Sequence, residues 1–235
     1  ETGIVSSCSS ANDEVTVFLD KRPSVNAGAD ISICGTSTTL NATASLYGGT
    51  AMWTSADPAI VFADSSLLNT TASGFSYGTT ALTYTATSAG GTCADVTDVV
   101  NVIRNTPPDA IATSVDVCEN AFGSGTGTIS LAQVQAPAVR DQITGIAGSV
   151  GRTVSYFTDA ARLSAFTGSM AVTSSSIIYT RVTRTDVTPG CTNDGVITFN
   201  INSLPTAISG VIDVCEDTQG TNTATALNLL LLESQ

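Results

Sequence analysis

The spacing of the six cysteines constrains this sequence more than any other feature. Three of them end short alternating apolar segments and form an early series, Cys34, Cys118 and Cys215. The other three precede alternating segments that run to a proline and form a late series, Cys8, Cys93 and Cys191. The steps are 84 and 97 residues along the early series, and 85 and 98 along the late one. Two independent series therefore predict one internal repeat of roughly 85 to 98 residues.

The repeat divides the chain into four parts. Residues 24–107 and 108–205 are predicted to be complete domains, each long enough to bury a hydrophobic core. Residues 1–23 are expected to be the end of an incomplete domain, including a strand at 14–17, and residues 206–235 the start of another. We therefore expect the sequence to be a segment of a longer protein.

The repeat also suggests how the cysteines pair. Within each complete domain an early cysteine would bond to a late one, Cys34 to Cys93 and Cys118 to Cys191. Such bridges persist in oxidising surroundings, which predicts an extracellular location. The alternative is a zinc site, but the chain has neither closely spaced ligand pairs nor any histidine. The two remaining cysteines are expected to be unpaired in the fragment, and these are Cys8 and Cys215.

Short alternating segments separated by Gly, Pro and Asp predict antiparallel strands. In the first complete domain they are expected at 30–34, 38–44, 50–55, 59–63, 67–73, 79–88 and 95–103. In the second they are expected at 128–131, 153–158, 176–183 and 195–202, with a helical turn between 132 and 148. Seven short strands with a disulfide and one tryptophan are typical of an immunoglobulin-like sandwich. The predicted fold class is all-β, as tandem immunoglobulin-like sandwiches with one intradomain disulfide each.

Aromatic residues recur at matching places in the two complete domains. Trp53 is matched with Tyr156, and Tyr84 with Tyr179. An aromatic side chain on a central strand usually anchors the core of a sandwich, so all four are predicted to be core residues. The alternative is that Trp53 or Tyr156 is exposed as a platform on which a sugar stacks.

Charge and composition exclude several classes of function. The net charge is −12, with one lysine and no histidine, which disfavours nucleic acid and anionic membrane surfaces. The longest apolar run, Leu229–Leu232, is too short to span a membrane. Without histidine there is no Ser-His-Asp triad, and the carboxylate pairs Asp95/Asp98 and Asp213/Glu216 are better explained as surface charge. The glycines of 123–127 are a turn, since no lysine follows them as in a phosphate loop. We therefore predict no enzymatic activity and no cofactor.

Calcium is the one ligand that the composition leaves open. Carboxylates of an acidic extracellular protein are suitable ligands for this hard cation. The candidates lie near predicted loops or at a domain junction, and these are Asp30, Asp116, Glu119, Asp159, Asp186 and Asp194. The chain has no Asp-x-Asp-x-Asp loop of the kind that would specify such a site.

Several motifs resemble those of a known class of repeats. Asn26-Ala-Gly-Ala-Asp30, followed by Ile-Ser-Ile-Cys-Gly-Thr36, resembles the start of the polycystic-kidney-disease-like (PKD-like) repeats of large Bacteroidota surface proteins. Four other segments resemble related repeats that carry a Tyr-Thr-Asp-Ala motif, and these are Val117–Glu119, Tyr156–Ala161, Gly190–Thr192 and Leu204–Thr206. One departure is Ser155-Tyr156, which stands where that motif has a tryptophan. The resemblance implies adhesins or gliding-associated proteins, exported by the type IX route to the bacterial cell surface.

The predicted function is structural and adhesive, as a semi-rigid rod of immunoglobulin-like domains in a cell-surface or secreted protein. Its expected partners are the other such domains of the same chain, and surface polysaccharide or neighbouring filament chains, with no nucleic acid and no membrane insertion. Two alternatives remain open. The chain could be a carbohydrate-binding module of an extracellular enzyme, or a filament subunit completed by strands from its neighbours.

Overall fold

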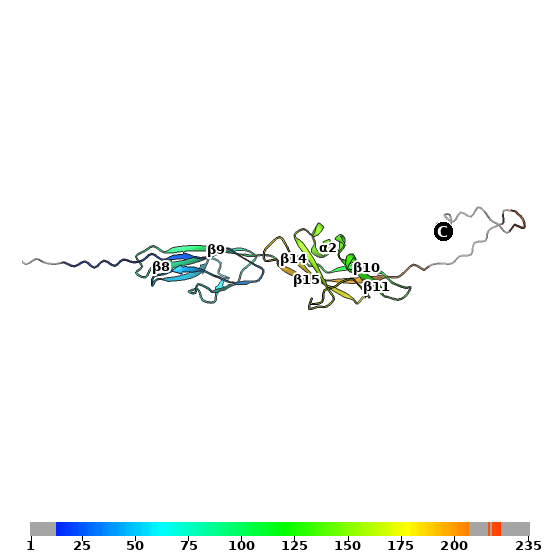
Figure 1. Ribbon diagram of the computed structural model, residues 1–235, viewed down its shortest axis with the longest axis horizontal. Helices are drawn as coiled ribbons and strands as arrows, with labels where there is room; N and C mark the ends of the chain where they lie inside the picture. The colour runs from blue at the N-terminus through cyan, green and yellow to red at the C-terminus, as the bar shows by residue number, and fades with distance from the viewer. Residues whose placement is uncertain (1–12, 207–215, 217, 222–235) are drawn as a thin grey trace, which may run out of the picture.

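A computed structural model describes residues 13–206, 216 and 218–221. Two β-rich units lie end to end along its long axis (Figure 1). Their hydrophobic cores are separate, one built from residues 25–102 and the other from residues 110–201. Cys8 and Cys215, predicted to be unpaired, lie outside the described residues. The domain boundaries at 24–107 and 108–205 remain predictions.

The N-terminal unit consists of short strands arranged in two layers. Its strands are β1 (Ser24–Asn26), β2 (Ile31–Ile33), β3 (Ser37–Thr39), β4 (Thr43–Ser45), β5 (Thr50–Ser55), β6 (Val61–Phe62), β7 (Thr71–Ser73), β8 (Gly78–Thr87) and β9 (Val96–Arg104). One sheet has the order β2-β9-β8-β5, and β3-β7-β6 forms another. A short pair, β1-β4, completes the unit. The first strand of the main sheet, β2, runs parallel to the last, β9, whereas the other pairs in that sheet are antiparallel.

Alternation along the strands explains how this unit closes. In β8 the side chains of Leu82, Tyr84 and Ala86 are fully buried, while the threonines between them lie toward the surface. Trp53 lies opposite Tyr84 in the register of β5 with β8, and the two ring centroids are 4.6 Å apart. The Trp53 indole also donates to the Leu67 carbonyl at 3.2 Å. A period of two with apolar residues on one face is what a half-solvated strand requires.

The C-terminal unit repeats the main sheet and changes the layer that covers it. Its elements are β10 (Thr113–Cys118), β11 (Gly127–Ser130), α1 (Leu131–Val134), α2 (Pro137–Thr144), η1 (Ala147–Ser149), β12 (Arg152–Phe157), β13 (Ser169–Val172), β14 (Ile177–Arg184) and β15 (Thr192–Asn202). The main sheet has the order β10-β15-β14-β12, with β10 parallel to β15. The second layer is the pair β11-β13. This strand order, with the first strand parallel to the last, is that of an immunoglobulin-like sandwich in both units.

The registers of the two main sheets match in detail. Ile31 lies opposite Val102 in the first unit, and Val115 lies opposite Phe199 in the second. The offsets between these pairs are 84 and 97 residues, within one residue of the steps from Cys34 to Cys118 and from Cys93 to Cys191, which are 84 and 98. Corresponding residues of the two units therefore occupy corresponding places in the sheet.

The helical turn predicted between 132 and 148 is confirmed as α1, α2 and η1. Ser130 and Gln133 form a capping box that begins α1, because each side chain accepts from the other residue's backbone N–H. Pro137 occupies the first turn of α2, and Gly145, with φ of 66°, ends it in the left-handed conformation that glycine favours. Val134 and Ile143 are fully buried, so these helices cover part of the core.

One predicted strand and one predicted core residue are wrong. Residues 14–17 were expected to form a strand, but no strand pairs with them and Val15 and Val17 are more than four-fifths exposed. Tyr179 was expected to match Tyr84, but the residue of β14 that lies opposite Tyr156 is Thr180, which is fully buried. A slip of one residue moves a strand side chain to the other face. Tyr179 is accordingly half-buried on the outer face.

Candidate functional site: the disulfide-bonded junction of the two units

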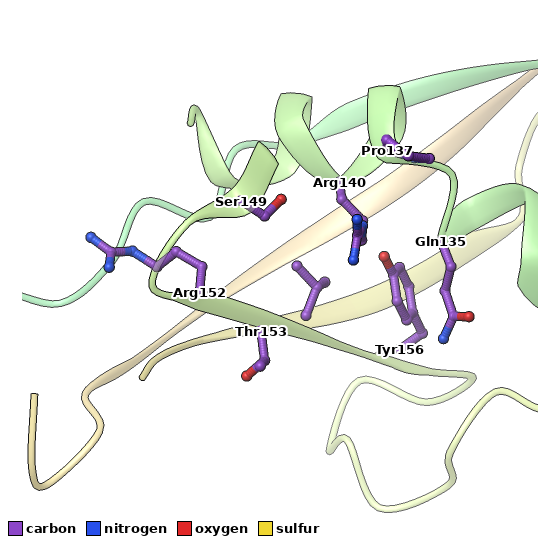
Figure 2. A pocket seen from close by; sticks show the side chains of 8 residues that line it. Gln135, Pro137, Arg140, Ser149, Arg152, Thr153 and Tyr156 are labelled. Atoms are coloured by element: carbon purple, nitrogen blue, oxygen red, sulfur yellow. The ribbon is translucent and has the colours of Figure 1, made fainter. Parts of the chain in front are cut away.

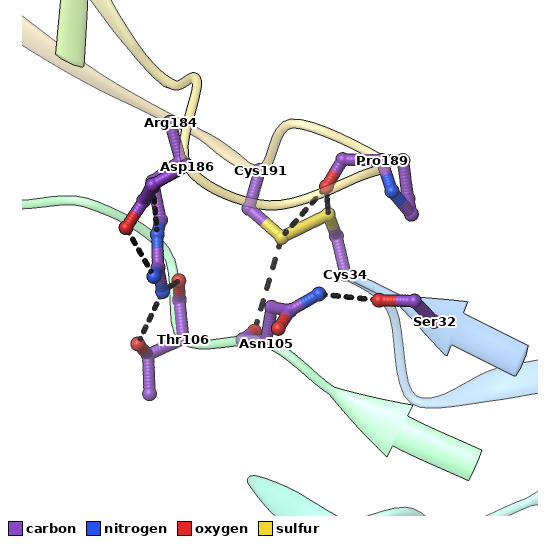
Figure 3. The surroundings of a disulfide bond; sticks show 8 residues. All are labelled: Ser32, Cys34, Asn105, Thr106, Arg184, Asp186, Pro189 and Cys191. Carbon is purple, nitrogen blue, oxygen red and sulfur yellow. Dashed lines mark hydrogen bonds and ion pairs between the residues drawn. A yellow bond between two sulfur atoms is a disulfide. The ribbon is translucent and has the colours of Figure 1, made fainter. Parts of the chain in front are cut away.

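A disulfide joins Cys34 of the N-terminal unit to Cys191 of the C-terminal unit, with their Cα atoms 5.4 Å apart. This overturns the predicted intradomain bonds, Cys34 with Cys93 and Cys118 with Cys191. Cys93 and Cys118 carry free thiols. The bond crosses the boundary between the two units, as Figure 3 shows.

Strand direction explains why the bonded cysteines meet. β9 leads into the linker between the units, residues 105–112. Because β2 runs parallel to β9, Cys34 at the end of β2 lies at the linker end of its unit. β10 leads away from the linker, and β15 runs parallel to it, so Cys191, just before β15, lies at the linker end of its own unit. By the same reasoning Cys93 and Cys118 lie at the two ends remote from the linker. An intradomain bond would have had to span the length of a sheet.

The linker is bonded to both units. Asn105 donates its backbone N–H to the Ile33 carbonyl at 2.8 Å and its side-chain amide to Ser32 Oγ at 2.7 Å. On the other side, Asn193 donates to the Pro108 carbonyl at 3.0 Å. These bonds fix the linker at both of its ends, next to the disulfide.

Arg184 of β14 connects the C-terminal unit to the middle of the linker (Figure 3). Its guanidinium donates to the carbonyl and the hydroxyl of Thr106, each at 3.1 Å. Asp186 holds the same guanidinium in a two-pronged ion pair at 2.8 and 3.0 Å, and Arg152 of β12 also contacts Asp186, at 3.0 Å. Such bidentate pairing orients an arginine as well as neutralising it.

The electrostatics of Asp186 follow from these two arginines. The hydrogen bond from Arg184 is the main cause that holds the pKa of this carboxyl well below its usual range, and the charge of Arg152 adds to it. The same interaction raises the pKa of Arg184. Asp186 therefore stays ionised at any ordinary pH, and it keeps Arg184 directed at the linker.

Gly190 is required where the loop turns toward the disulfide. A Cβ at this position would lie 2.5 Å from the Arg184 carbonyl, a backbone atom that cannot easily move. The tight approach allows Arg184 N–H to donate to the Cys191 carbonyl at 2.9 Å. The loop is thus pinned against β14, and Cys191 is 98% buried at its end.

The N-terminal unit makes a second junction of the same kind, with the segment that precedes it. Asp20 accepts from the Ser88 hydroxyl at 2.5 Å, and from Gly90 N–H and Thr92 N–H at 3.2 and 3.1 Å. The hydrogen bond from Ser88 is the main cause that holds the pKa of Asp20 well below its usual range. The loop 88–93 is therefore hydrogen-bonded to the segment before the first unit. The loop 186–191 has the corresponding position beside the linker.

A pocket lies away from the junction, between α2 and β12 (Figure 2). It is lined by Gln135, Pro137, Arg140, Ser149, Arg152, Thr153, Val154 and Tyr156. Arg140 and Tyr156 point toward one another, whereas Arg152 points away toward Asp186. Burial raises the pKa of Tyr156 to about 12, and its hydroxyl donates to the Val134 carbonyl at 3.0 Å. Tyr156 is thus a structural anchor, and the pocket has no residue pair suited to acid–base chemistry.

Neither candidate sugar platform presents its ring to solvent. Trp53 and Tyr156 are each at least 95% buried, as is the predicted core residue Tyr84. Two exposed rings carry a cation over one face instead, Tyr47 with Lys21 at 5.1 Å and Tyr77 with Arg104 at 4.1 Å. On the face that the cation covers, a sugar would have to displace it before stacking on the ring.

The carboxylates proposed for calcium are dispersed and occupied. Among the described residues, no group of three or more Asp, Glu, Cys or His side chains could hold a metal ion. Asp194 pairs with Arg162 and Arg181, while Asp159 and Glu119 accept backbone N–H groups of their own loops. Asp116 accepts from Asn200, and Asp30 from Asn101. The structure therefore gives these residues local structural roles.

Two members of the carboxylate pairs considered for catalysis also accept backbone N–H groups. Asp98 accepts the Ala27 N–H at 2.8 Å, which fixes β1 against β9. Glu216 accepts the Gly220 N–H at 2.8 Å, as Glu119 accepts the Gly123 N–H, and Asp213 lies outside the described residues.

In the part of the chain that the structure describes, no helix has the length and apolar character to cross a membrane.

Sequence reasoning missed the interdomain bond although the signal was present. The cysteine series gave the correct repeat, but it was combined with an expected pairing inside each sandwich. Strand direction would have corrected this, since the sequence places the early cysteine at the end of the first strand and the late cysteine at the start of the last. In a sheet where these strands are parallel, those two positions lie at opposite ends.

No protein-family model matches this chain, and no curated protein does. Solved structures give weak likenesses. A PKD domain from the KIAA 1837 protein is 20% identical over 35% of this chain and 85% of its own, with a TM-score of 0.30. The titin I-band fragment I67–I69 is 10% identical over 79% of this chain and 66% of its own, with a TM-score of 0.37. Extracellular domains 3–5 of Drosophila OTK are 10% identical over 77% and 63%, with a TM-score of 0.31. The description of the fold therefore rests on strand order and register.

Proposed function

We propose that this chain is a non-enzymatic, extracellular rod segment that transmits tension along a larger surface protein. The observation that carries the proposal is the Cys34–Cys191 disulfide, which joins the two units across their linker. A bond of this kind also supports an oxidising, extracellular location. The role agrees with the cell-surface adhesins of Bacteroidota that the sequence motifs resemble, and we include that origin in the proposal.

The disulfide changes where an applied force travels. It closes a loop that contains residues 35–190, which is most of both units. When the chain is pulled from its ends, force passes from β2 through the disulfide into β15 and bypasses this loop. The hydrogen-bonded linker, with Asn105, Thr106 and Pro108 held by their neighbours, also restrains bending at the junction. The arrangement therefore suits a strut that resists both extension and bending.

Single-molecule stretching of the full chain by terminal tags tests the proposal. In the oxidised protein we expect no unfolding step from within residues 35–190. After reduction, or in Cys34→Ser, we expect two steps of about 30 nm each, because a unit of roughly 80 to 90 residues extends by about 3.5 Å per residue.

The matched control is the double variant Cys93→Ser/Cys118→Ser, which removes the free thiols of the described residues and leaves the disulfide intact. It should stretch like the oxidised wild type. Steps of about 30 nm in the oxidised wild type would overturn the proposal, since the disulfide would then not carry the force.

A further inference from the structure

Cys93 and Cys118 are not isolated thiols in this fold, because each occupies the place of a residue that is bonded elsewhere in the same structure. Cys93 stands 98 residues before Cys191, and Cys118 stands 84 residues after Cys34. We propose that both are halves of further interdomain disulfides, in which the early cysteine of one unit bonds to the late cysteine of the next unit along the chain. The partner of each is the complementary cysteine of an adjoining immunoglobulin-like unit.

The surroundings of Cys93 already contain the features of the bonded site. Its Sγ lies 3.5 Å from the carbonyl oxygen of Asp20, just as Cys191 Sγ lies 3.9 Å from that of Asn105. Asp20 and Asn105 are 85 residues apart, which is the repeat. Both carbonyls belong to the segment before the buried proline that begins the unit, Pro23 or Pro108. Cys93 is therefore held against the preceding segment in the same manner as the bonded Cys191.

Cys118 corresponds to Cys34 on the other side of the bond. Cys34 follows β2 at the level of Asn105, whose N–H donates to the Ile33 carbonyl. Cys118 ends β10 directly opposite Asn202, which is 97 residues after Asn105. Both early cysteines therefore lie beside an asparagine at the point where the last strand leaves the unit. Cys118 is exposed there, so its thiol is accessible to an adjoining unit.

The chemistry is an ordinary oxidation. The two thiols lose two protons and two electrons and form one S–S bond. The electrons reduce the disulfide of a dithiol oxidoreductase, or a low-molecular-weight disulfide, to two thiols. The compartment that maintains the Cys34–Cys191 bond supplies such an oxidant, and it would not leave an exposed thiol such as Cys118 unreacted.

A tandem duplication tests the pairing within one chain. Residues 1–205 are followed directly by residues 24–235, so that Ser24 follows Pro205 as it naturally follows Pro23. After expression under oxidising conditions, the disulfides are mapped by proteolysis and mass spectrometry without reduction. We expect Cys34–Cys191 in each copy, and one new bond between Cys118 of the first copy and Cys93 of the second.

Two matched variants identify the partner. Cys93→Ser in the first copy should leave the new bond intact, and Cys93→Ser in the second copy should abolish it. The Cys34–Cys191 bonds report that each copy has folded. A shorter protein, with residues 24–107 appended after Pro205, provides the same test if the duplication does not fold.

Cys118 of the first copy found as a free thiol, or bonded to any residue other than Cys93 of the second copy, would overturn the proposal. So would a bond that forms only between separate molecules. The mapping does not depend on whether the rod carries force, so its result is independent of the proposed function.

Discussion

The two units share one strand order but close their cores differently. In the N-terminal unit the main sheet is covered by the strands β3-β7-β6, and the core centres on the Trp53–Tyr84 pair. In the C-terminal unit a two-stranded layer and the helices α1 and α2 cover the sheet, with Tyr156 bonded to the end of α1. All four ion pairs found in the described part of the chain belong to this second unit. The comparison shows that the same main sheet can be covered by strands around an aromatic pair, or by helices to which Tyr156 is hydrogen-bonded.

Trp53→Ala should produce the largest difference in stability between the two units. Truncating a fully buried aromatic leaves a cavity and costs about 3–5 kcal/mol, all of it in the N-terminal unit. Hydrogen exchange resolved by unit should show loss of protection in residues 24–104 and retention in residues 113–202. The control is Met52→Ala, on the same strand but 52% exposed, which should change stability little. An unchanged melt in Trp53→Ala would show that the aromatic pair does not hold the first core.

Tyr156→Phe addresses the polar anchor of the second unit. The change leaves the Val134 carbonyl without the hydroxyl that donates to it, which costs about 1–3 kcal/mol when the acceptor is buried. Denaturant unfolding should show the loss in the C-terminal unit alone. Tyr179→Phe, on the outer face of the neighbouring strand, is the matched control and should stay within about 0.5 kcal/mol of wild type. Equal effects of the two substitutions would contradict the assigned role.

Acidification should produce the smallest change in stability of the three, at the junction where Arg184 and Asp186 meet the linker. The pKa of Asp186 is lower in the folded protein than its ordinary value of 3.8, mainly through the hydrogen bond from Arg184. Its stabilising contribution is therefore complete above that ordinary value and is lost as the pH falls through the folded one. Below about pH 4, wild type should lose stability at the junction, and Asp186→Asn should lose less over the same range. Nuclear magnetic resonance of the Thr106 amide, followed from pH 5 downward, would detect the change. Identical pH profiles would exclude a role for this ion pair.

Much of the fold could be predicted from local pattern. The alternation along 79–88 located β8 to within one residue at each end, and the apolar spacing in 132–148 indicated the helices. The predicted strands at 38–44 and 67–73 were too long, since only β3, β4 and β7 pair within them. β13 was not predicted at all, because Ser169–Val172 is too short to show a clear alternation.

The site was harder to predict, because it depends on how strands run in space. Cysteine spacing reports the length of a repeat, and it does not report which end of a sheet a residue occupies. Likewise, Arg184 ends β14 and Asp186 lies in the polar loop that follows, and nothing in the local sequence indicates that Arg184 bonds to Thr106. The hydrogen bonds that matter at the junction join residues about 70 to 85 positions apart.

The Cys34–Cys191 bond also determines how the protein responds to proteolysis. Any single peptide bond between these cysteines, including every bond of the linker 105–112, can be cut without separating the two ends of the chain. A protease would have to cut outside this loop, or at least twice inside it, to release a fragment. If the further disulfides exist, the loop that begins at Cys118 overlaps the loop that ends at Cys191, so that successive loops cover the linkers in turn. One cleavage would then leave the whole rod in a single covalent piece.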